Sequence, residues 1–151
     1  MSRSAQWLFE AYLPAGVPDD AVRAAAASAL GVSADRVLVV ADKAITSATW
    51  DVLVVRLTDA APMDPVFPAT IRVSSRLEAG NRVDVAQGIS SALGMAIVAD
   101  VAPADLQDDW MLLFPDGTTR LITINDDGAF VLSQRDLVDI AHARLTASHA
   151  A

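Results

Sequence analysis

The tetrapeptide SALG occurs twice, at residues 28–31 and 91–94, and each copy is followed by an apolar run that ends in VAD, at 40–42 and 98–100. Before the first copy, apolar residues recur at the helical spacing i, i+3, i+4 and i+7, and the glycine stands where a helix commonly ends. The segment before the second glycine has a similar pattern. The two echoes therefore predict two helices that each lead into a strand.

The segments around these helices have the patterns of strands. Residues 6–13 (QWLFEAYL) alternate between the two faces of a half-buried strand, and residues 50–58 and 69–76 are also strand-like. Residues 37–40 are wholly apolar, which predicts a strand in the centre of a sheet. The second helix, over 83–93, is followed by another short apolar strand.

The last third of the chain predicts a hairpin and a helix. Two strands, over 110–114 and 118–125, are joined by Pro-Asp-Gly, in which Pro fixes φ and Gly accepts a positive φ. Ser133 is expected to cap a final helix, with Asp136 completing a weaker form of the capping box. Residues 147–151 are expected to fray. The buried stripe of this helix is expected to consist of Leu137, Ile140, Ala141 and Leu145.

This order of elements predicts a single domain over residues 1–151 with an α+β fold. The leading topology is a ferredoxin-like βαββ(β)αβ core with a mostly antiparallel sheet, to which a C-terminal hairpin or meander and a terminal helix are added. The segments 6–58 and 69–125 would be the two halves of an internal repeat if the two SALG copies result from a duplication. Because Leu-Gly is also common capping chemistry, that question stays open.

Composition limits the classes of function. The chain has 11 basic and 19 acidic residues, a net charge of −8, which opposes binding to nucleic acid. It has no cysteine and no apolar run long enough to span a membrane, and residues 1–7 lack the apolar region of a secretory signal. We therefore expect a cytoplasmic protein that binds neither nucleic acid nor membranes.

Groups able to perform catalysis are scarce. The chain has two histidines, His142 and His149, and one lysine, Lys43, and it lacks the common nucleophile and phosphate-binding motifs. The aspartates of 100–109 lack the spacing of a calcium loop. We expect no enzymatic activity, no catalytic residue, no cofactor and no metal site.

One constellation suggests a binding surface. Residues 100–127 contain seven aspartates and one base, Arg120, interleaved with large apolar side chains. Aromatic anchors surrounded by charge are typical of protein interfaces, although the same rings could be ordinary core. The predicted partner-binding residues are Asp105, Asp108, Asp109, Trp110, Phe114, Asp116, Asp126 and Asp127.

The segment DDWMLLFPDGTTRLITI (108–124) resembles the hairpin of various small acidic bacterial proteins, some of which are immunity proteins of polymorphic or contact-dependent toxin systems. The resemblance implies a cytoplasmic protein that binds a toxin domain and blocks it. Nuclease toxins are commonly basic, which would suit an acidic inhibitor.

Two hypotheses for the function follow. The first is a non-catalytic protein-binding module, most specifically an immunity-type inhibitor of a toxin domain. The second is a small-molecule-sensing domain of the ferredoxin-like type, whose ligand would lie at the turn 14–16 before the first helix. A homodimer that covers a sheet edge is compatible with either hypothesis.

Overall fold

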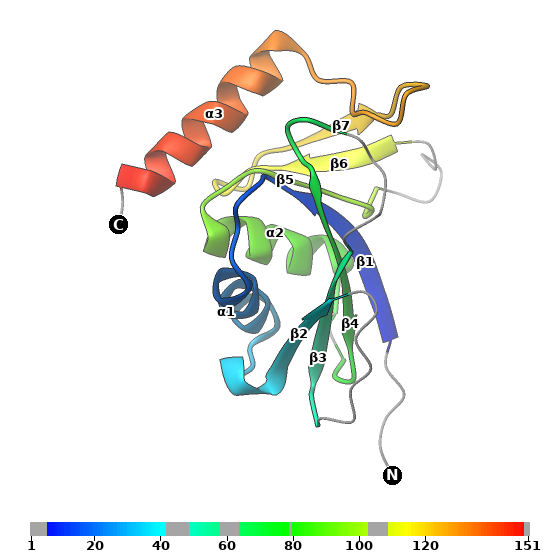
Figure 1. The fold of residues 1–151 in the computed structure, drawn as a ribbon, viewed down its shortest axis with the longest axis vertical. Helices are drawn as coiled ribbons and strands as arrows, with labels where there is room; N and C mark the ends of the chain where they lie inside the picture. Colours follow the sequence, from blue (N-terminus) through cyan, green and yellow to red (C-terminus); the bar gives the residue numbers. More distant parts are fainter. Residues whose placement is uncertain (1–5, 42–48, 58–63, 79, 103–108, 150–151) are drawn as a thin grey trace.

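The computed structural model describes residues 6–41, 49–57, 64–78, 80–102 and 109–149. In this part of the chain, three α-helices and one short 3₁₀ helix accompany a seven-stranded, mostly antiparallel sheet, so the predicted α+β class is confirmed (Figure 1). The elements in chain order are β1 (Gln6–Leu13), α1 (Asp19–Leu30), η1 (Ala34–Arg36), β2 (Val37–Ala41), β3 (Val52–Leu57), β4 (Ala69–Ser75), α2 (Arg82–Leu93), β5 (Ile97–Ala99), β6 (Asp109–Leu113), β7 (Thr119–Thr123) and α3 (Gln134–His149).

The strand order is β2-β3-β4-β1-β5-β6-β7, and neighbouring strands are antiparallel except for β2 and β3, which are parallel. This is not the strand order of a ferredoxin-like fold, so that part of the prediction is corrected. Residues 37–40 do not lie in the centre of the sheet: they form most of β2, which is an edge strand. A short apolar run specifies a strand but not its neighbours, because long-range packing decides which strands pair.

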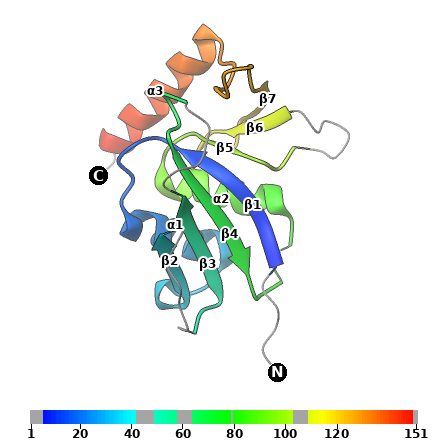
Figure 2. The ribbon, with the colours of Figure 1, turned by 45° about the vertical axis from the view of Figure 1, so that its right-hand side comes forward.

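Helices α1 and α2 pack against each other on one face of the sheet (Figures 1 and 2). Each ends at the expected glycine, since Gly31 and Gly94 have φ values of 69° and 68°. Gly88 of α2 lies against α1, where a Cβ at position 88 would be 2.9 Å from the Cβ of Ala29. The main core lies between these helices and the sheet, and its buried side chains include Phe9, Leu13, Val54, Ile71 and Val73.

A second core lies on the opposite face of the sheet, beside β1, β5, β6 and β7. The ring of Tyr12 lies 5.2 Å from the ring of Phe130, which also contacts Phe67. The buried carboxylate of Asp64 accepts backbone N–H groups from two residues that follow it and, at 2.8 Å, from Phe130. Burial, and then nearby carboxylates, raise the pKa of the Tyr12 hydroxyl to about 12.

The final helix, α3, begins as the sequence predicts. The backbone N–H of Ser133 donates to the Asp136 carboxylate and the backbone N–H of Asp136 donates to the Ser133 hydroxyl, each at 3.0 Å, which is the reciprocal geometry of a capping box. The helix continues to His149, past the start of the predicted frayed tail. None of the helices in the described part of the chain is long and apolar enough to cross a membrane.

The predicted buried stripe of α3 is wrong. Ile140 is buried, but Leu137, Ala141 and Leu145 are exposed, and over residues 134–145 the other buried side chain belongs to Asp136. The helix is therefore turned so that an acidic side meets the rest of the molecule. The cause lies in β7, where Arg120 pairs with the acids of α3.

Candidate functional site

Arg120 joins β7 to α3. Its guanidinium donates to Asp136 Oδ1 at 2.7 Å and to Asp139 Oδ2, and it lies 4.8 Å from the centroid of the Phe114 ring. Burial raises the pKa of Asp136, but the hydrogen bonds from Arg120 and Ser133 outweigh burial and keep that pKa below its ordinary value. Both interactions require a carboxylate on the inner side of α3, and they fix the rotation of this helix about its axis.

A cleft of about 700 Å³ opens between α3, the turn after β6 and the end of α2. Its lining contains both signs of charge, from Arg120 and Arg135 and from Asp116 and Asp139, together with His142. The size is in the range of small-molecule sites. Within the described ranges, no group of three or more His, Cys, Asp or Glu side chains is placed to hold a metal ion.

The aromatic residues of the predicted binding strip lie in the second core. Phe114 is buried, Trp110 is half-buried, and the Trp110 ring lies 5.1 Å from the ring of Tyr12. Successive residues of a strand point to opposite faces of the sheet, so Asp109 points away from the face to which Trp110 belongs. The acids and the aromatic rings of this segment therefore do not share one surface.

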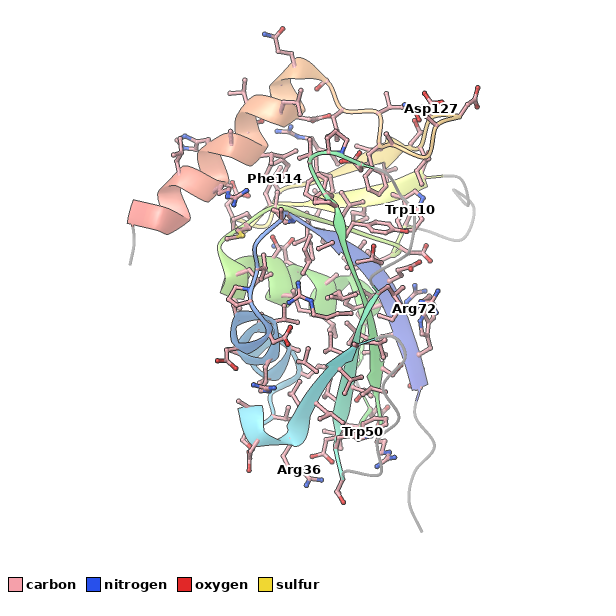
Figure 3. All side chains as sticks on the ribbon, viewed as in Figure 1. Arg36, Trp50, Arg72, Trp110, Phe114 and Asp127 are labelled. Carbon is pink, nitrogen blue, oxygen red and sulfur yellow. The ribbon has the colours of Figure 1, made fainter. Side chains whose placement is uncertain are left out.

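The acids of the strip lie at two separate ends of the β6–β7 hairpin. Asp109 begins β6 and pairs with the last residue of β7, after which the turn 125–128 carries Asp126 and Asp127. Asp116 lies at the other end, in the turn between the two strands. In Figure 3, Asp127 is at the tip of its turn, well away from Phe114. Asp105 and Asp108 lie outside the described residues.

Asp116 has a local structural role. Its carboxylate accepts the backbone N–H of Thr118 at 2.9 Å, and this hydrogen bond is the main reason why the pKa of Asp116 is below its ordinary value. The turn is completed by Gly117, whose φ of 95° is the positive value that Pro-Asp-Gly predicts. Asp116 therefore stabilises the turn and lines the cleft. It lies at the opposite end of the hairpin from Asp109, Asp126 and Asp127.

One face of the hairpin combines the carboxylate of Asp109 with exposed apolar side chains. Asp109 pairs with Thr123, and the backbone N–H of Val131 donates to the Thr123 carbonyl at 2.8 Å, so these three residues form a row across neighbouring strands. Leu121 lies on the same face, two residues before Thr123. Leu121 is 46% exposed and Val131 is 52% exposed. We call this row, Leu121 and the adjoining turn 125–128, which carries Asp126 and Asp127, the hairpin face.

Leu121 and Val131 are not among the residues that the sequence predicts for the binding surface. The alternation of 118–125 could have placed Leu121 opposite to its neighbour Arg120, but it could not tell which of the two faces is covered. Val131 belongs to the short apolar segment 129–132, whose pattern does not show which side chains are exposed. The bridge between Ile124 and Phe130 places Val131 beside β7, where its side chain is exposed.

The turn proposed for a small ligand, 14–16, adjoins a small apolar space of about 240 Å³ between α1 and α2. Arg56 reaches this region from β3, and it donates to the Val17 carbonyl and to Asp19, each at 2.8 Å. That guanidinium is therefore already engaged by groups of the protein, and the start of α1 carries two further acids, Asp19 and Asp20, that oppose an anion.

Comparisons with known proteins give no match: no family model, no curated protein and no solved structure is similar to this chain.

Proposed function

We propose that the protein is a non-catalytic protein-binding module and that the hairpin face is its binding surface. The observation that supports this proposal is the exposure of Leu121 and Val131 on the face that carries Asp109, next to the turn that carries Asp126 and Asp127. Apolar side chains that are surrounded by charge are typical of interfaces, in which the apolar centre excludes water and the charged rim speeds association.

The charge of this surface favours a basic partner. Residues 109–132 contain one base, Arg120, and its guanidinium is paired with the acids of α3 on the other side of the hairpin. The net charge of the chain, −8, would also attract a basic protein at long range. A positively charged protein domain is therefore the partner that this surface suits best.

Within this class, we propose an immunity-type inhibitor that binds a toxin domain in the cytoplasm and blocks it. The resemblance of residues 108–124 to the hairpins of such proteins supports this more specific form. The hairpin face would cover part of the toxin, so the inhibitor would need no catalytic group of its own.

Affinity capture from the source cell tests the binding surface. The baits are the wild type, the double variant Asp126→Lys/Asp127→Lys, and a matched control, Asp35→Lys/Glu78→Lys, which makes the same change in charge at exposed acids outside the hairpin. We expect a basic protein that the wild type and the control capture and the hairpin variant does not. Its association with the hairpin variant should be slower by about tenfold or more and should depend less on salt.

Growth assays with the captured protein test whether the chain is a toxin inhibitor. Expression of that protein alone should arrest growth, and co-expression of the wild-type chain, but not of the hairpin variant, should restore it. Equal capture by all three baits would exclude the hairpin face as the binding surface. If the captured protein does not affect growth, the chain is not a toxin inhibitor, and the broader proposal of a protein-binding module remains.

The cleft beneath α3 supports a second candidate, a small-molecule-sensing domain. Its lining of two arginines, two aspartates and a histidine would suit a ligand that carries both signs of charge, such as a free amino acid. A thermal-shift screen with amino acids and nucleotides tests it, since a ligand at 100 times its Kd adds about 2.7 kcal/mol of stability. Arg135→Gln should remove the shift, and the absence of any shift would exclude this candidate.

A further inference from the structure

The cleft beneath α3 holds more negative than positive charge. Arg120 donates to Asp136 at 2.7 Å and to Asp139, so two carboxylates face its single positive charge. Asp116 and Arg135 are the other charged residues of the described lining. Asp136 is less exposed than Asp139, so it is the closer partner of Arg120, and these two groups neutralise each other. Asp116, Asp139 and Arg135 then leave the cleft with a net charge of −1.

The end of α2 adds hydrogen-bond acceptors to this region. Gly94, which ends the helix, lines the cleft, and the last turn of α2 contains no basic residue that would offset the negative pole of the helix. Gln87 lies two turns earlier on the same side of α2, and its Nε2 donates at 2.6 Å to the carbonyl of Phe114, a residue of the lining. Its Oε1 is buried and accepts no hydrogen bond from the described residues. A ligand with N–H donors and positive charge suits these acceptors.

Arg135 is the guanidinium of the lining that a ligand can reach. Its side chain is 83% exposed and its Nε lies 3.8 Å from Asp139, whereas the Arg120 side chain is 24% exposed and closely paired. Arg135 also belongs to the first turn of α3, where the helix dipole favours negative charge. His142 completes the titratable lining and is neutral in the formal charge at pH 7. A carboxylate of the ligand can therefore bind Arg135 without breaking a buried ion pair.

We infer that the cleft binds a basic amino acid, such as free lysine or arginine. This inference rests on the second candidate function, the small-molecule-sensing domain. The carboxylate of the ligand pairs with Arg135, and its two cationic groups pair with Asp116 and Asp139. A ligand of net charge +1 neutralises the charge of −1 that the three side chains carry, whereas a neutral amino acid leaves it in place and an acidic one increases it. The charge of the whole chain, −8, also attracts a cation.

Calorimetric titration of the wild type with a matched series of ligands tests the charge of the site. Lysine should bind about tenfold more tightly than norleucine, which lacks only the side-chain ammonium group, and glutamate should bind more weakly than norleucine. Cadaverine, which is lysine without its carboxylate, should also bind about tenfold more weakly than lysine. Norleucine, glutamate or cadaverine that binds as tightly as lysine overturns the inference, and the small-molecule-sensing domain then stands. Absence of binding by every amino acid up to about 10 mM excludes both.

Substitution of Asp116 tests the location of the site. Asp116→Asn removes the charge and keeps an oxygen that can accept the Thr118 N–H, so the turn should be retained. The variant should bind lysine about tenfold more weakly than the wild type does and should bind norleucine equally well. The matched control, Asp127→Asn, makes the same change in another turn, away from Phe114 and outside the lining, and should bind lysine as the wild type does (Figure 3). Unchanged affinity of Asp116→Asn for lysine overturns the inference.

Arg135→Gln tests the orientation of the ligand. Because Arg135 is assigned to the carboxylate, the variant should bind lysine and norleucine more weakly by the same factor and should bind cadaverine as the wild type does. A distorted cleft would weaken the binding of all three ligands. Equal weakening of cadaverine, or unchanged binding of lysine, would overturn the inference.

Discussion

Replacement of Arg120 with Met is expected to detach α3 while the rest of the fold stays intact. The methionine side chain retains apolar contact with the Phe114 ring, over which the guanidinium lies, but it removes both ion pairs to α3. Asp136 then keeps its hydrogen bonds with Ser133 and loses its charged partner. A carboxylate that is buried without a counter-ion is destabilising, and the helix can escape this cost by moving away from the sheet.

The exposed fractions of the Arg120, Asp136 and Asp139 side chains determine the expected loss of stability. The Asp136 side chain is 12% exposed and that of Arg120 is 24% exposed, so their pair lies between the buried class, in which loss of one partner costs about 3–5 kcal/mol, and the surface class, at about 0–1 kcal/mol. Asp139 is more exposed and adds little. The expected cost is about 2–3 kcal/mol, which corresponds to an increase of about 30- to 160-fold in the population of molecules with α3 open.

Native-state hydrogen exchange measures this opening residue by residue. In Arg120→Met, the amides of α3 should exchange about 30 to 160 times faster than in the wild type, while the amides of β1 and β4 should be unchanged. Arg36→Met is the matched control, because Arg36 forms a bidentate pair with Asp51, with distances of 2.9 and 3.0 Å, far from α3. That variant should leave the exchange of α3 unaltered.

A second substitution separates the lost attraction from the charge that is left behind. Asp136→Asn in the Arg120→Met background removes the unpaired carboxylate and keeps an oxygen that can cap the helix, so it should recover part of the protection of α3. Exchange of α3 in Arg120→Met at the wild-type rate would contradict this prediction. Loss of protection in all elements together would also contradict it, because α3 would then open only when the whole molecule unfolds.

Gly88→Ala should lower the free energy of unfolding by about 1–2 kcal/mol in chemical denaturation, because the new Cβ would lie 2.9 Å from that of Ala29; a gain of about 1 kcal/mol, as helix propensity alone predicts, would show that the two helices can separate without cost. Asp64→Ala should cost about 3 kcal/mol or more, since it leaves three backbone N–H groups, including that of Phe130, without their acceptor, and a melting temperature equal to that of the wild type would contradict this role. Tyr12 is the one tyrosine of the chain, so the ultraviolet absorbance of tyrosinate reports it alone and should show a pKa of about 12. Because burial raises this pKa, the free energy of unfolding should be unaffected by Tyr12 below pH 10 and should fall by about 2–3 kcal/mol as the pH rises from about 10 to 12. A titration midpoint near pH 10 would show that the Tyr12 hydroxyl is not buried.

The elements that short-range interactions define could be predicted from the sequence. Gly31 and Gly94 end α1 and α2, and Ser133 with Asp136 begins α3, because capping groups act within a few residues of the helix end. The turn at Gly117 follows from the three residues that form it. These features depend only on residues that are close together in the sequence.

The order of the strands and the side of each element that is buried were decided by the tertiary structure. Asp109 and Trp110 are neighbours in sequence, yet they belong to opposite faces of β6, and only the second core shows that the face of Trp110 is the covered one. The apolar stripe of α3 predicted the wrong buried side, because Arg120, which lies 16 residues before Asp136, binds the acidic side of that helix. Periodicity in a sequence identifies the two sides of a helix or strand, but pairs that are distant in sequence determine which side the rest of the molecule covers.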